Sequence, residues 1–149
     1  MIDEHGNLRP CFSQGGILDT FEFTVTTQVG RFDISAWIRL IGTDLLVAIS
    51  GGEKPHIGAV AVAQPRPSLR NPDVTSATAS VICCLGHKED ALAKAASEKI
   101  SAAFNRRVVV TAGIHWDNLT DEDIRQVQQN GEVLIELIRQ RCTEFFFSS

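Results

Sequence analysis

The order of the hydrophobic periods limits what this chain can fold into more than any other feature. Apolar and polar residues alternate from Phe21 to Thr26 and from Phe32 to Leu40, a period of two that is typical of half-buried strands. The run from Leu45 to Ile49 is apolar throughout, which indicates a central strand covered on both faces. Further short strands are expected at residues 57–63, 77–85 and 108–110.

The second half of the chain predicts two helices. Apolar residues recur at steps of three and four between Leu92 and Phe104, which indicates an amphipathic helix that begins near His87. A second helix is expected to begin at Thr120, because this residue can cap the backbone and the acidic run Asp121 to Asp123 complements a helix N-terminus. Asn130-Gly131 either ends that helix or marks a close contact within a longer one.

Strands followed by helix, strand and helix predict an α+β fold: a mixed, mainly antiparallel sheet of about five to six strands with two main helices packed on one face. With 149 residues, we expect one domain spanning 1–149, in which residues 1–19 form an irregular arm. Prolines 65, 67 and 72 predict a loop over residues 65–72. Phe145 to Phe147 either dock on the sheet or bury in a partner subunit, and we expect a homo-oligomer.

Composition excludes several classes of function. The net charge of −4 comes with no basic run, so we expect no nucleic-acid partner. No apolar run is long enough to span a membrane and no signal sequence is recognisable, which favours the cytoplasm and no membrane partner. Cys11, Cys83, Cys84 and Cys142 lack the spacing of a zinc clamp, so reduced cysteines are expected.

Three loops combine glycine with histidine at the ends of predicted strands, and we expect them to meet in one pocket. The first contains Gly51, Gly52, Lys54, Pro55, His56 and Gly58, the second Gly86, His87 and Lys88, and the third Gly113, His115 and Trp116. Glycine permits positive φ and a close approach of the backbone to a ligand, whereas proline fixes φ.

The three histidines offer one kind of chemistry. Neutral imidazoles are good ligands for zinc, iron or nickel, so His56, His87 and His115 form a candidate site for a divalent transition metal. A loop histidine is also commonly solvated or structural, and ligands drawn from distant segments have no diagnostic spacing.

Anion recognition is the other chemistry. A helix that begins at His87 has free N–H groups that favour a phosphate, Lys88 adds a positive charge, and Lys54 with the Gly51 and Gly52 amides offers a second anion contact. Alternatively, Glu89 and Asp90 already complement the helix dipole. Trp116 either stacks on a planar ring such as an isoalloxazine or packs in the core.

The motifs of common enzyme classes are missing from the sequence. It contains no Gly-x-Ser-x-Gly, no phosphate-binding P-loop, no Gly-x-Gly-x-x-Gly and no His-Glu-x-x-His. No pair of nucleophile and base can be nominated, so a binding module is favoured over an enzyme.

The three loops together resemble a known family over roughly residues 32 to 130. The resemblance rests on Gly51-Gly52-Glu53-Lys54-Pro55-His56-Ile57-Gly58, Gly86-His87-Lys88-Glu89 and Ala112-Gly113-Ile114-His115-Trp116-Asp117-Asn118. These segments are similar to those of the prenylated flavin chaperone-like proteins, the small D subunit associated with gallate and 4-hydroxybenzoate decarboxylases.

The resemblance implies a non-catalytic protein that binds prenylated FMN or FMN and delivers it to the large catalytic subunit of a prenylated-flavin-dependent decarboxylase. On the residues matched, it implies roles for Gly51, Gly52, Pro55, His56, Gly58, His87, Lys88, Gly113 and His115 in holding the cofactor or shaping the loops. Two alternatives stay open: a small metalloenzyme with a three-histidine site, and a purely structural decarboxylase subunit.

Overall fold

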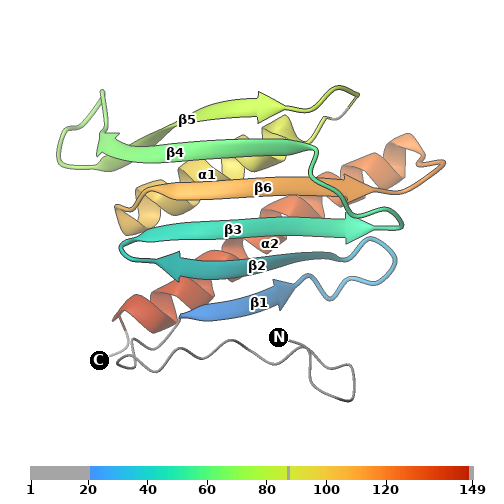
Figure 1. Cartoon of the computed structure of the whole chain (residues 1–149), viewed down its shortest axis with the longest axis horizontal. Helices are drawn as coiled ribbons and strands as arrows, with labels where there is room; N and C mark the ends of the chain where they lie inside the picture. Colours follow the sequence, from blue (N-terminus) through green and yellow to red (C-terminus); the bar gives the residue numbers. More distant parts are fainter. Residues whose placement is uncertain (1–20, 87, 148–149) are drawn as a thin grey trace, which may run out of the picture.

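The computed structural model describes residues 21–86 and 88–147 (Figure 1). Its elements in chain order are β1 (Glu22–Thr26), β2 (Ile34–Ile41), β3 (Asp44–Gly52), β4 (Ala59–Pro67), β5 (Thr75–Cys83), α1 (Asp90–Phe104), β6 (Val108–His115) and α2 (Asp121–Phe147). The predicted irregular arm, residues 1–19, lies outside the described residues. Neither helix in the described part of the chain has a segment long and apolar enough to cross a membrane.

The six strands β1 to β6 form one sheet in the order β1-β2-β3-β6-β4-β5. Among these strands β3 and β6 run parallel, and the other neighbouring pairs are antiparallel. The prediction of a mixed, mainly antiparallel sheet is therefore confirmed. Because carboxyl ends of parallel neighbours meet at one edge, Gly52 at the end of β3 lies opposite His115 at the end of β6.

Both helices cover the same face of the sheet, as predicted (Figure 1). Helix α1 packs on β4, β5 and β6, whereas α2 packs on β1 and β2 and along α1. Alternate residues of the central strands, such as Val47 and Val110, are fully buried beneath the helices and meet Ile100 of α1 and Leu134 of α2 in one core. Residues of opposite alternation lie on the far face of the sheet.

Strand β4 is longer than predicted, and the prediction of a loop over residues 65–72 was wrong in its first part. Pro65 pairs with Ala77 and Pro67 with Thr75 in the β4–β5 ladder. Strand β6 pairs with β4 only as far as Ala63, so the prolines lie where β4 has lost its second neighbour. Proline is tolerated at such a position because its missing N–H deprives no second strand of a hydrogen bond.

The first helix begins later than predicted, at Asp90 instead of near His87, and ends as expected at Asn105, which adopts the left-handed conformation. Residue 89 occupies the N-cap position without forming a side-chain cap. The Glu89 side chain is instead directed to His56 of the first loop, with 3.3 Å between Oε1 and Nε2.

The start of α2 is confirmed, because Thr120 and Asp123 form a reciprocal capping box. The Asp123 N–H donates to Thr120 Oγ1 (3.2 Å), and the Thr120 N–H donates to Asp123 Oδ2 (2.9 Å). The helix continues through Asn130 and Gly131, which mark a close contact: Asn130 Nδ2 donates to the Phe32 carbonyl (2.8 Å). A Cβ on Gly131 would lie 3.1 Å from Leu92 of α1.

The aromatic residues at the end of α2 dock partly on the chain itself. Phe146 packs near Phe21 and Phe104, with ring centroids 5.5 Å away in both cases. Phe147 keeps 67% of its surface exposed.

Candidate functional site

Residues 53–58 leave the end of β3 and lie against the end of β6, and glycines make this close approach possible. Gly52 has a φ of +87°, and a Cβ there would overlap the His115 carbonyl. A Cβ on Gly113 would overlap the His56 carbonyl, and one on Gly51 would lie 2.6 Å from Ile34 Cγ2. These predicted site glycines thus have a packing role within the chain, whether or not a ligand also approaches them.

Backbone hydrogen bonds hold the loop in place. The Glu53 N–H donates to the His115 carbonyl (2.7 Å), and the Gly58 N–H donates to the Ala112 carbonyl (2.9 Å). The Gly58 carbonyl in turn accepts from the Cys84 N–H (2.8 Å), which ties the loop to the end of β5. The first loop, the end of β6 and the segment leading to α1 are therefore joined at one end of the sheet.

A chain of polar contacts crosses this end of the molecule. His115 Nε2 donates to Asp117 Oδ1 (2.9 Å), and Lys54 Nζ donates to Asp117 Oδ2 (2.6 Å). The hydrogen bond that Lys54 donates, together with the one from His115, lowers the pKa of Asp117, and donating this bond to the Asp117 carboxylate raises the pKa of Lys54. The charge of Lys54 is therefore matched within the protein, which weakens its predicted role as an anion contact.

His56, from the first loop, lies close to Lys54 and His115. Its Nδ1 donates to the Lys54 carbonyl (2.9 Å), and its ring centroid lies 6.3 Å from that of His115. The Glu89 carboxylate faces the other side of the ring. Two of the predicted histidines thus converge, while His87 lies outside the described residues.

The three-histidine metal site stays a prediction. Within residues 21–86 and 88–147, no group of three or more His, Cys, Asp or Glu side chains is arranged to hold a metal ion. The predicted set includes His87, which lies outside the described residues.

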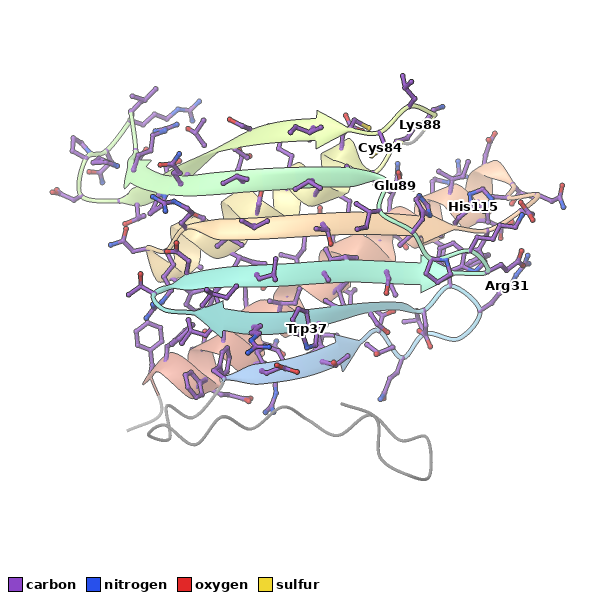
Figure 2. All side chains as sticks on the ribbon, viewed as in Figure 1. Arg31, Trp37, Cys84, Lys88, Glu89 and His115 are labelled. Carbon is purple, nitrogen blue, oxygen red and sulfur yellow. The ribbon has the colours of Figure 1, made fainter. Side chains whose placement is uncertain are left out.

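A groove with a cavity volume of about 910 Å³ opens between the N-terminal halves of α1 and α2, on the helix side of the sheet. Its apolar wall contains Ala91, Leu92, Ala95, Ile114, Trp116, Leu119, Ile124 and Val127, and its polar lining contains Lys88, Glu89, His115, Arg125, Gln128, Gln129 and Glu132. Figure 2 shows Lys88, Glu89 and His115 at the end of the sheet where β3, β5 and β6 finish. We call Lys54, His56, His115 and Asp117 the polar cluster, and through His115 it adjoins this mostly apolar groove.

The predicted site residues divide between these two features. Lys88, His115 and Trp116 line the groove. Trp116 is only 8% exposed and meets Phe32 edge to face (5.5 Å between ring centroids), so it is a core residue with one part on the groove wall. Lys54 and His56 belong to the adjoining polar cluster. Pro55 is exposed in the loop that connects them.

Sequence reasoning missed the groove itself and the contact of Glu89 with His56. The small residues Ala91, Ala95 and Gly131 could have indicated the groove, because small side chains on facing helices leave space or permit close packing. A second hollow, of about 540 Å³, lies at the opposite end of the sheet around Thr43, Gln64 and Arg106. It contains none of the predicted site residues.

Comparisons with known proteins agree with this architecture. A solved structure described as "Crystal Structure of a Novel Chaperone Complex for Yeast 20S Proteasome Assembly" shares the fold, with a TM-score of 0.52 and 15% identity over 84% of this chain and 97% of that chain. Protein LpdD of Lactiplantibacillus plantarum (strain ATCC BAA-793 / NCIMB 8826 / WCFS1) is 28% identical over 110 residues, which cover 68% of this chain and 71% of the relative.

The profile of the prenylated flavin chaperone LpdD-like domain matches residues 28–143, a range that contains the first loop, the end of β6 and every residue that lines the groove. The family resemblance inferred from the glycine–histidine loops is therefore confirmed. This chain belongs to the prenylated flavin chaperone LpdD-like family.

Proposed function

We propose that this chain binds prenylated FMN, or FMN itself, in the groove between α1 and α2. As a non-catalytic chaperone, it then delivers the cofactor to the large catalytic subunit of a prenylated-flavin-dependent decarboxylase. The observation that carries the proposal is a mostly apolar groove with histidine and cationic side chains at its mouth, in a domain of a chaperone family.

The groove fits the chemistry of a flavin. Ligand pockets are commonly about 300–1,000 Å³ and mainly apolar, with a few polar groups that fix orientation. The cavity of about 910 Å³ is in this range, and aliphatic walls such as Leu92 and Leu119 suit a planar ring system. Lys88 and Arg125 on the same lining supply positive charge for a phosphate.

The polar cluster supports the groove in this proposal. Asp117 joins Lys54 of the first loop to His115 at the groove mouth, so the cluster fixes one wall of the opening. We assign these residues a positioning role and no catalytic step. A transition metal held by His56, His87 and His115 stays an additional prediction; elemental analysis of metal-supplemented protein tests it, and sub-stoichiometric metal would remove it.

Binding can be tested by blocking the groove. Mix the purified chain with prenylated FMN, remove free ligand by filtration and record the visible spectrum of the retained protein. Ala91 is exposed on α1 and lines the groove, so Ala91→Trp should fill the groove without altering the core and should reduce retention at least about tenfold. Ala103→Trp, a position on the same helix that is exposed and outside the groove lining, is the matched control and should retain flavin normally.

A colourless wild-type retentate at micromolar protein would overturn the proposed function. Equal losses in the two tryptophan variants would overturn the assignment to this groove. Riboflavin lacks the phosphate of FMN, so comparing the two ligands tests whether Lys88 contacts the phosphate. Lys88→Ala should weaken FMN binding about tenfold and leave riboflavin binding unchanged. Equal effects on the two ligands would exclude Lys88 as a phosphate contact.

Delivery of the cofactor to the decarboxylase requires a second assay. The chain preloaded with cofactor should activate the apo form of the large decarboxylase subunit faster than free cofactor does, and Ala91→Trp should remove this advantage. If the wild type and His56→Ala, His115→Ala and Ala91→Trp variants all activate equally, the chain is a structural subunit instead.

A further inference from the structure

The face of the sheet opposite the helices carries a continuous patch that is apolar except for Thr111. Cross-strand register places Trp37, Ala48, Thr111, Val60 and Ile82 side by side in one row across the sheet. The adjoining row contains Leu46, Val109 and Val62. We call these residues the open-face patch.

None of the open-face patch belongs to the core that the helices cover, nor to the partly buried residues that pack against it. Ile82 is 74% exposed and Val62 is 36% exposed, and the other six residues of the patch are half-buried. Trp37 lies over the middle of β2 in Figure 2, away from the cluster around His115. A contiguous apolar surface of this kind on a folded domain usually marks an interaction site.

The size of this face suits a stable interface. Six strands spaced about 4.8 Å apart, each of about eight residues rising about 3.3 Å, give the whole face, which is the open-face patch together with its polar margins, an area of roughly 600–700 Å². Two such faces packed together bury roughly 1,200–1,400 Å², which exceeds the roughly 1,000 Å² expected of a biological interface. Sheets pack face to face at about 10 Å in this manner in β-sandwiches.

The lack of charge on the open-face patch favours a second copy of this chain as the partner that covers it. Neither row has a charged side chain on the central strands β3, β6 and β4. The adjoining row continues through Arg39 of β2 to Glu22 of β1, and these two side chains form an ion pair (3.5 Å) at the sheet edge. In a two-fold dimer a surface patch contacts the same patch on the other copy. A patch with charges of one sign would therefore repel its copy, whereas an uncharged apolar patch with a polar rim is self-complementary.

We propose that two copies of this chain form a dimer through the open-face patch, with their sheets packed face to face and their helices outside. The groove between α1 and α2 opens on the helix side and stays accessible in this arrangement. Each dimer therefore presents two separate grooves. The dimer requires no particular ligand in the groove.

Sedimentation equilibrium of the full chain from about 1 to 100 μM tests the proposal. The wild type should approach twice the chain mass of 16.3 kDa. Val62→Lys should weaken association at least about 100-fold, because the interface would bury two unpaired ammonium groups. Val62 is already solvent-exposed in one copy, so this variant should fold, and an unchanged far-UV circular dichroism spectrum checks that it does.

Val133→Lys is the matched control, because Val133 is 45% exposed on α2, away from the sheet's open face, and should leave the dimer intact. A wild type that sediments at 16.3 kDa over the whole concentration range would overturn the proposal and favour residues 1–20 or the decarboxylase as the occupant of this face. A dimer that is equally stable in Val62→Lys would overturn it too, because the interface must then lie elsewhere.

Discussion

Gly113→Ala tests whether the first loop must lie directly on β6. Gly113 does not have a positive φ, so the backbone accepts alanine, and such a change would normally stabilise a protein by about 0.4–1 kcal/mol. The structure predicts the opposite sign. A Cβ on Gly113 would overlap the His56 carbonyl, far inside the 3.0 Å limit of real Cβ contacts, and the atom that it meets is backbone.

The magnitude follows from the contacts that the loop would lose. If residues 53–58 lift from β6, the hydrogen bonds from Glu53 to His115 and from Gly58 to Ala112 break. Each is worth about 1 kcal/mol, so a loss of about 2 kcal/mol is partly offset by the usual gain of alanine. We expect a net destabilisation of about 1–2 kcal/mol, which is a fall in Tm of about 3–6 °C for a chain of this length.

Calorimetry measures the fall in Tm, and amide hydrogen exchange locates it. Exchange at Glu53 and Gly58 should accelerate in Gly113→Ala. Gly42→Ala is the control: Gly42 has a φ of +61° and a Cβ there would meet no atom within 4 Å, so alanine costs only about 1–2 kcal/mol of backbone strain. It should lower Tm similarly and leave the loop protected. A Gly113→Ala protein with unchanged or higher Tm and protected loop amides would refute the reasoning.

Three further predictions concern single side chains. The Lys54 hydrogen bond lowers the pKa of Asp117, so its stabilisation is present above the ordinary aspartate pKa of about 4 and is lost as the pH falls through the lowered pKa. The Tm advantage of the wild type over Asp117→Asn at pH 7 should therefore shrink as the pH is lowered below about 4, and a constant difference would contradict this. Thr120→Ala removes half of the capping box and should cost about 1 kcal/mol in a denaturant titration; no change would show that the cap is not needed. Burial raises the pKa of Cys142 to about 12, so iodoacetamide at about pH 7.5 should label it only after unfolding, and rapid labelling of the native chain would contradict its burial.

Local patterns predicted the elements well because their signals are short-range. The capping residues at Thr120 are three positions apart, and alternation in β2 needs only neighbouring residues. The convergence of His56 and His115 was also predictable, because β3 and β6 end side by side. His115, which was expected in a loop, is instead the last residue of β6, and His56 follows β3. The glycine–histidine loops further sufficed to identify the family.

The remaining features depend on contacts between distant segments. Pro65 can lie in β4 because β6 stops pairing with β4 at Ala63. The residues around Pro65 in the sequence do not show where that pairing ends. Glu89 suits a helix N-terminus by sequence, yet its carboxylate faces His56, 33 positions earlier in the chain. The groove is lined by both helices, which approach closely at Leu92 and Gly131, so its existence could not be predicted from either helix alone.

The most direct test of the central claim is to map flavin binding on the chain by amide chemical shifts during a titration with FMN. We predict saturable changes at Leu92, Ala95 and Leu119 on the groove wall, and none at Val109 on the open face of the sheet. Changes centred on the open face or on the hollow around Thr43, or no saturable change at all, would contradict the assignment of flavin binding to this groove.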